Sequence, residues 1–389
     1  MTRRHGRSQT HREIAVFEPY LGHDTLGAVA RAFHERWLGM GAATREFEEE
    51  LARFLGLLDR QVLATNTGTS ALHLGLLAAG ARPGVEVIVP SFNFVADHQA
   101  IVATGATPVF CDIEEQTLGL DPDKARSLIN DRTAILLPLH FSGIPCEIDT
   151  LYDLAREHNL RVVEDATHAF GSSVDNRKVG SFGDIACFSF DPVKVITCID
   201  GGAVVLPDSE DVASLQQGRL LGIDRDTVER YRNGRAWDYD VVRPGYRYHL
   251  TNVMARIGLS QLARVDEFIT NRRRYCTLYQ ERLGNVEGIS VPLTSYDEIS
   301  PFIYWMRVTE SRRQALIDHL RGRGVATGIH FMPAHAFSFF GDAPRGDLSR
   351  TERVSSEIVT LPLHSFMHED DVEYICEVIA DFFTKRVGR

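Results

Sequence analysis

Between residues 60 and 205, short apolar runs rich in β-branched residues alternate with helical stretches, and this pattern restricts the possible folds more than any other feature. A chain that alternates strands and helices forms a mostly parallel sheet wrapped by helices. The sequence therefore predicts an α/β fold, in which ligands bind at the carboxyl ends of the strands. The runs begin at Gln61, Glu86, Pro108, Ala134, Arg161 and Ala186.

The length of 389 residues exceeds that of one average hydrophobic core, so we expect a large domain with a smaller companion. We place the boundary near residue 265, between a large domain at 13–264 and a small α+β domain at 265–389. Outside the alternating block, apolar periodicity predicts helices at Thr44–Leu57, Leu250–Arg274 and Arg312–Gly324 and a strand at Ile303–Met306.

Charge and cysteine usage exclude several classes of protein. A net charge of −11 has the wrong sign for a protein that grips nucleic acid over a wide face. The six cysteines lack paired spacing, which favours buried thiols over disulfides or a metal site. The basic N-terminus has no apolar run after it, and no segment is long and apolar enough to span a bilayer. We therefore expect a cytoplasmic protein that binds neither nucleic acid nor membrane.

Two strand ends predict a pyridoxal 5'-phosphate (PLP) site. Asp165 ends the run that begins at Arg161, and Lys194 follows the run that begins at Ala186. A pyridine cofactor needs a lysine that holds its aldehyde as an imine and an acid that keeps its ring nitrogen protonated. Taken alone, Asp165 could be a salt bridge or helix cap, and Lys194 could extend to water. Together they favour a site with both as catalytic residues.

A phosphate-binding corner is expected where an apolar helix begins after the first strand. Gly68 lets the backbone approach a ligand, and Thr69 and Ser70 offer hydroxyls and free amides at the positive end of the helix. Ser189 would add another hydroxyl. The alternative is a capped helix whose threonine satisfies only its own backbone.

Aromatic and histidine side chains near these strand ends have two interpretations. Strand alternation lets only one of Phe92 and Phe94 face the site, and Phe94 is the one expected to stack on the pyridine. For either phenylalanine alone, core packing is the ordinary explanation. His168 could contact the phenolic oxygen of the cofactor or be a core histidine.

At this point the sequence resembles the DegT/DnrJ/EryC1/StrS family of sugar aminotransferases, which have the aspartate aminotransferase fold. The similarity covers nearly the whole chain and includes residues 44–48, 84–91, 139–146, 164–171, 194–202, 245–248 and 328–331. It implies a three-layer PLP-transferase large domain and a homodimer whose two active sites are each completed by the partner chain.

The resemblance also implies individual roles. Lys194 becomes the Schiff-base lysine, Asp165 the partner of the pyridine nitrogen and His168 the contact to the ring hydroxyl, with Gly68, Thr69 and Ser189 on the phosphate. Arg247 stands where the family has an asparagine that reaches the phosphate across the dimer, and an arginine could clamp phosphate as a charged fork. Val195 replaces a frequent asparagine. The presence of Lys194 argues against a related dehydrating branch, in which a histidine replaces it.

The resemblance further implies an aminotransferase that moves nitrogen from an amino acid, by analogy L-glutamate, to a nucleotide-linked keto-deoxyhexose, with pyridoxamine 5'-phosphate (PMP) formed in turnover. We expect amination at C4, because residues 194–202 resemble those of 4-aminating members. Arg243 and His330 are expected to contact the substrate, although a surface charge or packed imidazole would explain them as well. The alternatives are a keto-cyclitol or C3-keto acceptor and a non-catalytic PLP-binding regulator. A nicotinamide dehydrogenase is disfavoured, because no Gly-x-Gly-x-x-Gly run follows the first strand.

Overall fold

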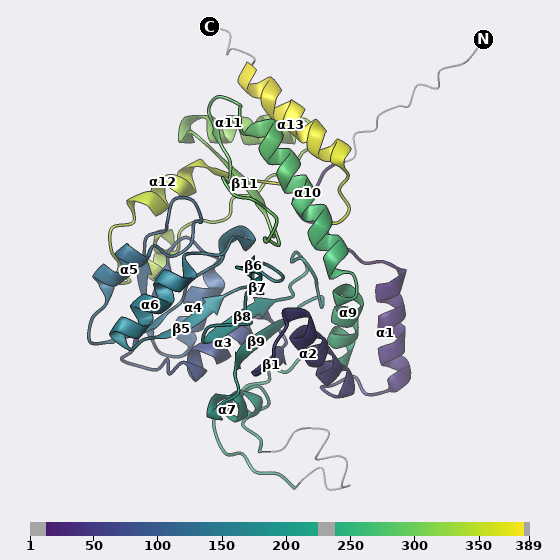
Figure 1. Ribbon diagram of the computed structural model, residues 1–389, viewed down its shortest axis with the longest axis vertical. Coiled ribbons are helices and arrows are strands. Elements are labelled where there is room, and N and C mark those ends of the chain that lie inside the picture. Colours follow the sequence, from purple (N-terminus) through teal and green to yellow (C-terminus); the bar gives the residue numbers. More distant parts are fainter. Residues whose placement is uncertain (1–12, 225–237, 385–389) are drawn as a thin grey trace, which may run out of the picture.

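A seven-stranded sheet runs through the centre of the molecule, for which a computed structural model describes residues 13–224 and 238–384 (Figure 1). Its strand order is β1-β9-β8-β5-β4-β2-β3. All neighbours from β8 to β3 pair in parallel, whereas β9 is antiparallel to both β1 and β8. The prediction of a mostly parallel sheet is confirmed. The strands are β1 Arg60–Thr65, β2 Glu86–Pro90, β3 Thr107–Cys111, β4 Thr133–Leu136, β5 Arg161–Asp165, β8 Ile185–Ser189 and β9 Gly202–Pro207.

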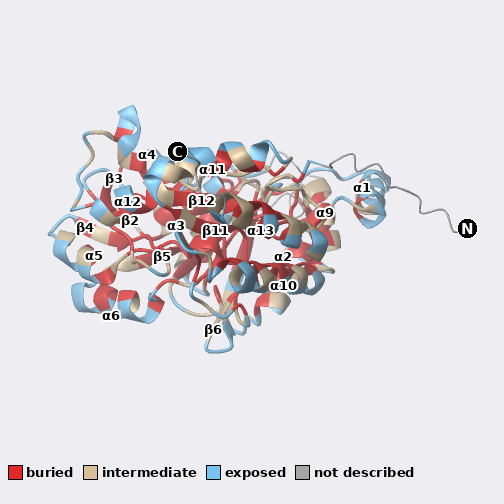
Figure 2. Cartoon of the chain, turned by 90° about the horizontal axis from the view of Figure 1, so that it is seen from above, coloured by how far each residue is buried: buried red, intermediate tan, exposed pale blue. Residues whose placement is uncertain are grey.

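Helices cover both faces of this sheet, as its alternating side chains require. On β5, Val163 packs in the cluster formed with α3, and the adjacent Val162 packs in the cluster formed with α6. Figure 2 shows the buried residues along the strands and the exposed residues on the outward sides of the helices. The first face carries α3 (Gly68–Ala78), α4 (Val95–Ala103) and α7 (Glu210–Gly218), and the second carries α2 (Ala42–Leu55), α9 (Asn252–Leu262), α5 (Pro122–Leu128) and α6 (Ile148–His158). Helix α1 (His23–Glu35) packs on α9.

The C-terminal part builds a second core around a small antiparallel sheet in the order β10-β11-β12. Tyr279 of α10 stacks on Tyr304 of β11, with ring centroids 4.7 Å apart, at the centre of this core. Helix α13 packs on α10, and α11 packs on α13 (Figure 1). These elements are α10 Val265–Leu283, β10 Ile289–Ser290, β11 Tyr304–Val308, α11 Glu310–Arg321, α12 Ser349–Glu357, β12 Ile358–Leu361 and α13 Glu369–Thr384.

The prediction of one helix over Leu250–Arg274 is wrong at Ala263 and Arg264, where α9 ends and α10 begins. Arg264 leaves the helical region, with φ −119° and ψ 7°. Directly after the break, Val265 and Phe268 of α10 still pack in the core that α9 contacts. Helix α9 buries Ala255 against the large sheet, whereas α10 continues to Tyr279 in the second core.

All six cysteines are free and buried, as the sequence predicted. Burial raises the pKa of Cys376 to about 12, so this thiol stays protonated at neutral pH. Within residues 13–224 and 238–384, no helix combines the length and the apolar character needed to cross a membrane.

Candidate active site

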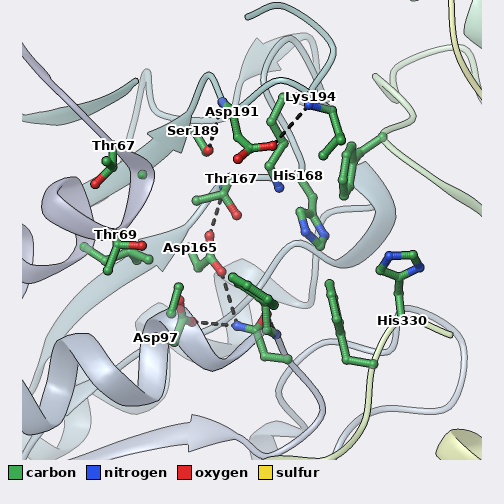
Figure 3. A pocket seen from close by; sticks show the side chains of 18 of the residues that line it. Thr67, Thr69, Asp97, Asp165, Thr167, His168, Ser189, Asp191, Lys194 and His330 are labelled. Atoms are coloured by element: carbon green, nitrogen blue, oxygen red, sulfur yellow. Dashed lines mark hydrogen bonds between the residues drawn. The ribbon is translucent and has the colours of Figure 1, made fainter. Parts of the chain in front are cut away.

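A cavity of about 290 Å³ opens at the carboxyl ends of β2, β5 and β8, beside the N-terminus of α3 (Figure 3). Asp165 and Lys194 both line it, so the fold brings together the two residues on which the cofactor prediction depends. The C-terminal part of the chain closes the cavity with Phe302, His330 and Phe331. The site therefore lies between the two cores.

Asp165 lies at the end of β5 with only 2% of its surface exposed. Its carboxylate accepts hydrogen bonds from the Thr167 amide at 2.9 Å and from the Asn93 side-chain amide at 3.2 Å. A buried carboxylate needs such partners because burial alone disfavours its charge. One side of this carboxylate faces the cavity, where a cationic ring nitrogen could meet it (Figure 3).

Lys194 sits in the loop that follows β8, where its own amide donates to the Asp191 carbonyl at 3.1 Å. Its ammonium lies 4.0 Å from the centroid of the Phe302 ring. Burial lowers the pKa of Lys194 to about 8, although Asp165, Asp191 and Asp97 act in the opposite direction. A lysine with this pKa is neutral in a useful fraction of molecules near pH 7, which nucleophilic attack on an aldehyde requires.

The N-terminus of α3 approaches the end of β8 very closely. A Cβ added to Gly68 would lie 2.7 Å from Cβ of Ser189 and 2.8 Å from its Oγ, so only glycine fits there. Thr67 and Ser70 form a reciprocal capping box, in which the Ser70 amide donates to Thr67 Oγ1 at 2.9 Å. The Ser70 hydroxyl is therefore used by the cap, whereas Gly68, Thr69 and Ser189 line the cavity. This corner offers helix amides and a strand-end hydroxyl to an anion.

Phe94 and Phe92 lie in different surroundings, but strand alternation is not the cause, because β2 ends at Pro90 and residues two apart in a strand share a face. Phe94 lines the cavity with 55% of its surface exposed, and Phe92 is fully buried in a cluster with Phe141. An exposed aromatic ring at the mouth of a cavity is available to stack on a planar ligand.

His168 lies 4.4 Å from Phe302, centroid to centroid, and is buried. Burial, and next the nearby charge of Lys194, hold the pKa of His168 well below its ordinary value, so the ring is neutral. Its Nδ1 accepts from the Ser142 amide at 3.4 Å, which leaves the hydrogen of the neutral ring on Nε2.

His330 also lines the cavity, and its Nδ1 lies 2.9 Å from Thr360 Oγ1. Burial and Lys194 lower the pKa of His330 to about 4. Unlike His330, Arg243 and Arg247 are exposed, and neither lines the cavity of its own chain. The Arg243 guanidinium contacts the hydroxyl of Ser214 on α7.

Several cavity residues were not singled out from the sequence. Phe302 and Phe331 come from the distant C-terminal part, and nothing local to them signals the site. Asp97 and Asn93 follow β2 directly, and their position after a strand end was the signal that could have identified them. Asp200 lines the cavity as well, and burial raises the pKa of this carboxyl.

The lining fits PLP on three independent observations. A lysine with depressed pKa and a buried carboxylate share the cavity. A glycine cradle, which a Cβ would fill, lies at a helix N-terminus beside a hydroxyl. An exposed phenylalanine stands at the mouth. This combination of parallel sheet, lysine, carboxylate and anion corner defines a PLP-dependent transferase of the aspartate aminotransferase type.

The chain belongs to the DegT/DnrJ/EryC1/StrS aminotransferase family, which it matches over residues 19–380. Three solved structures illustrate the similarity. The aminotransferase TlmJ from Streptoalloteichus hindustanus is 33% identical with a TM-score of 0.88, over 95% of this chain and 98% of TlmJ. Spr1654 from Streptococcus pneumoniae in its PMP form is 26% identical with a TM-score of 0.87, over 96% and 99%. DesI, solved in the presence of its TDP-sugar product, is 29% identical with a TM-score of 0.85, over 96% and 94%.

Spr1654 has also been solved in a PLP form, with 25% identity and a TM-score of 0.86 over 96% of this chain and 99% of Spr1654. The PLP cofactor predicted from Lys194 and Asp165 is thus supported by relatives that carry it. The chain is a PLP-dependent sugar aminotransferase.

Proposed function

We propose that this enzyme transfers an amino group from L-glutamate to C4 of a nucleotide-linked keto-deoxyhexose. One observation carries the chemistry, namely the cavity that holds both Lys194 and Asp165. A nucleotide-linked acceptor is supported by the similarity to DesI with its TDP-sugar product. C4 is supported by the resemblance of residues 194–202 to 4-aminating members.

In this proposal each cavity residue has a distinct task. PLP, when bound, supplies an aldehyde for covalent attachment and a ring that withdraws electrons. Gly68, Thr69 and Ser189 hold the phosphate, and Phe94 covers the ring face. His168 donates from Nε2 toward the ring hydroxyl, because its Nδ1 is already occupied by the Ser142 amide.

Asp165 keeps a proton at the ring nitrogen, and the Thr167 amide holds the carboxylate in place. Lys194 acts as the base that takes the α-proton from the amino-acid donor, and in the second half-reaction its ammonium form gives a proton to the sugar carbon that receives the amine. Its pKa of about 8 makes both proton transfers accessible near neutral pH. His330 faces the same cavity and is our candidate for a sugar contact.

The charge of the cavity supports a contribution of another chain to phosphate binding in this proposal. Among its lining residues, all of which lie in the described part of the chain, Lys194 is the only lysine or arginine, against four aspartates. Phosphates of the cofactor and of a nucleotide sugar would need further cations. Arg247 and Arg243 are exposed and outside this cavity, which suits residues that act in the site of a partner.

A homodimer is supported by an apolar strip beside these arginines. Leu221, Tyr239, Val241 and Val242 are 42–58% exposed, and the segments that carry them pair through Ile223 and Val241. Exposed apolar patches of this kind mark association surfaces. We expect a second copy of the chain to cover the strip and bring Arg247 to the partner's cavity. The six free cysteines are consistent with the cytoplasm as the place of action.

Reduction with borohydride tests the attachment site. The PLP-loaded protein should carry the reduced adduct on the peptide that contains Lys194. Lys178, which lies over the Phe54 ring outside the cavity, is the matched control, because Lys178→Ala should keep the adduct and Lys194→Ala should lose it. An adduct on another lysine of the native protein would refute the site.

Substrate assays test the acceptor. Nucleotide-linked 4-keto sugars, 3-keto sugars and keto-inositols are each incubated with the enzyme and L-glutamate, and the aminated product is identified. We expect the 4-keto sugar to be preferred. If glutamate alone causes no absorbance change of the bound cofactor, the donor assignment fails.

Complementation tests the shared site. Lys194→Ala and Arg247→Ala, co-expressed, should regain about a quarter of wild-type activity, since half of randomly formed dimers contain one intact site of two. Lys194→Ala with Asp165→Asn is the control, because both residues lie in one chain and no dimer of these variants has an intact site. Equal activity in the two mixtures would show that Arg247 does not act across the dimer.

A further inference from the structure

Asn93 bridges two buried carboxyl groups in the lining of the cavity. Its Nδ2 donates to Asp97 Oδ2 at 2.6 Å and to Asp165 Oδ2 at 3.2 Å (Figure 3). Its Oδ1 accepts from the Phe94 amide at 2.6 Å, so the orientation of the side-chain amide is fixed with both N–H groups toward the acids. Asp97 and Asp165 are 1% and 2% exposed, respectively.

Two carboxyl groups this close cannot both be ionised without a large electrostatic cost. Both accept from the same Asn93 amide nitrogen, and a proton on one of the two acids would remove the repulsion between them. Burial, and then the charge of Asp165, raise the pKa of Asp97 well above its ordinary value.

The hydrogen-bond partners indicate which acid carries the proton. Asp165 accepts from two donors, the Thr167 amide and Asn93, whereas Asn93 is the only donor described for Asp97. The carboxylate that accepts more hydrogen bonds stays ionised more easily. The other ionisable groups that face the pair are Lys194, which favours ionisation of Asp97, and the Cys187 thiol, whose pKa is itself raised by burial and by both acids. His98, on the same helix as Asp97, lies with Nε2 3.1 Å from the Pro90 carbonyl oxygen.

We propose that Asp97 is a positioning residue that donates its carboxyl hydrogen to Asp165 and thereby sets the basicity of the carboxylate under the cofactor ring. The Asp97–Asn93–Asp165 unit then carries a single negative charge, which matches the single positive charge of a protonated ring nitrogen. Without Asp97, the Asp165 carboxylate would lose one donor and become more basic. This inference deepens the proposed function and rests on the role of Asp165 there.

The first test uses the apoprotein, so it does not depend on the cofactor. Asp97→Asn retains a donor toward Asp165 and an acceptor for Asn93 but cannot ionise. In wild type, the unfolded chain releases the Asp97 proton above about pH 4 while the folded chain retains it, so folding is disfavoured as the pH rises. The folding equilibrium constant of Asp97→Asn relative to wild type should therefore increase about tenfold per pH unit from about pH 5. A ratio that stays constant from pH 5 to 8 would overturn the proposal.

The second test uses the PLP-loaded protein and follows the midpoint of the pH-dependent change in cofactor absorbance. Asp97→Ala removes the donor and should raise this midpoint by roughly half a unit to one unit, whereas Asp97→Asn should leave it near wild type. Equal midpoints in both variants would refute the coupling to Asp165. If Asp97→Ala does not fold, the Asp97→Asn titration of the apoprotein still decides. Failure of PLP to attach at Lys194 would instead refute the proposed function and leave the apoprotein result standing.

Discussion

The depressed pKa of Lys194 makes a quantitative prediction about how the enzyme captures its cofactor. With a pKa of about 8, roughly one Lys194 side chain in ten is neutral at pH 7. A lysine with the ordinary pKa of about 10.4 would be neutral in only about one molecule in 2,500. Covalent capture of PLP needs the neutral amine, so with Lys194 as the proposed attachment residue its burial should accelerate capture by about two orders of magnitude at pH 7. The rate should rise about tenfold per pH unit below pH 8 and level off above it.

Substitution of Asp191 tests the cause of this pKa. Asp191 favours the charged form of Lys194, so Asp191→Asn should lower the pKa further. The asparagine Oδ1 can still accept from the Val193 amide, which donates to Asp191 Oδ1 at 3.1 Å, so the loop should be preserved. Loss of one nearby charge is expected to lower the midpoint by roughly half a unit to one unit, which speeds capture at pH 7 by about 3- to 5-fold.

The assay is stopped-flow absorbance of apoprotein mixed with PLP between pH 6.5 and 10, in wild type, Asp191→Asn and Asp123→Asn. Asp123 is an exposed acid in the first turn of α5, so its substitution changes the net charge equally but should leave the midpoint unchanged. A wild-type midpoint near 10, or slower capture at pH 7 in Asp191→Asn, would refute the explanation by burial opposed by nearby carboxylates.

Four further substitutions separate the binding corner from the cores. Gly68→Ala places a methyl group 2.7 Å from the Ser189 side chain of β8, so it should cost about 1–3 kcal/mol in the free energy of unfolding and weaken PLP binding. Gly27→Ala on α1, with open space around it, should do neither. Equal stability of the two variants in urea would contradict the close approach. Phe92→Ala should cost about 3–5 kcal/mol of stability. Phe94→Ala should cost less than about 1 kcal/mol yet weaken PLP binding in an equilibrium titration. A larger loss of stability in Phe94→Ala than in Phe92→Ala would contradict their burial. Arg272 is buried and donates from Nη1 to the carbonyl groups of residues 301, 302 and 363. Arg272→Leu should therefore lower the free energy of unfolding, measured with denaturant, by about 2–4 kcal/mol. An unchanged free energy of unfolding would show that these bonds do not hold the second core together.

The part of the site that could be predicted lies where the chain leaves the large sheet. Asp165 and Lys194 each follow a strand whose apolar residues are contiguous in the sequence, and carboxyl ends of parallel strands meet at one edge. Gly68 is equally local, because it opens the helix that follows the first strand. For these residues the backbone period and the strand direction are sufficient to place the side chain.

The single-helix prediction at residues 250–274 failed for the opposite reason. Apolar side chains continue at helical spacing through Ala263 and Arg264, so the local pattern contains no stop. The break lies within the core that Ala255, Val265 and Phe268 share, and only later residues of α10, such as Tyr279, reach the second core. No local signal contains that information.

By itself, then, the sequence determined the α/β class, the lysine and carboxylate of the cofactor site and the anion corner at Gly68, because steric preferences and hydrogen bonding act between residues near one another in the chain. Only the tertiary structure decided that Phe302 lies against Lys194, that Asp97 and Asp165 share the Asn93 side-chain amide and that Arg247 lies outside its own cavity. These relations depend on how separate elements pack, and packing brings together residues that no short-range pattern connects.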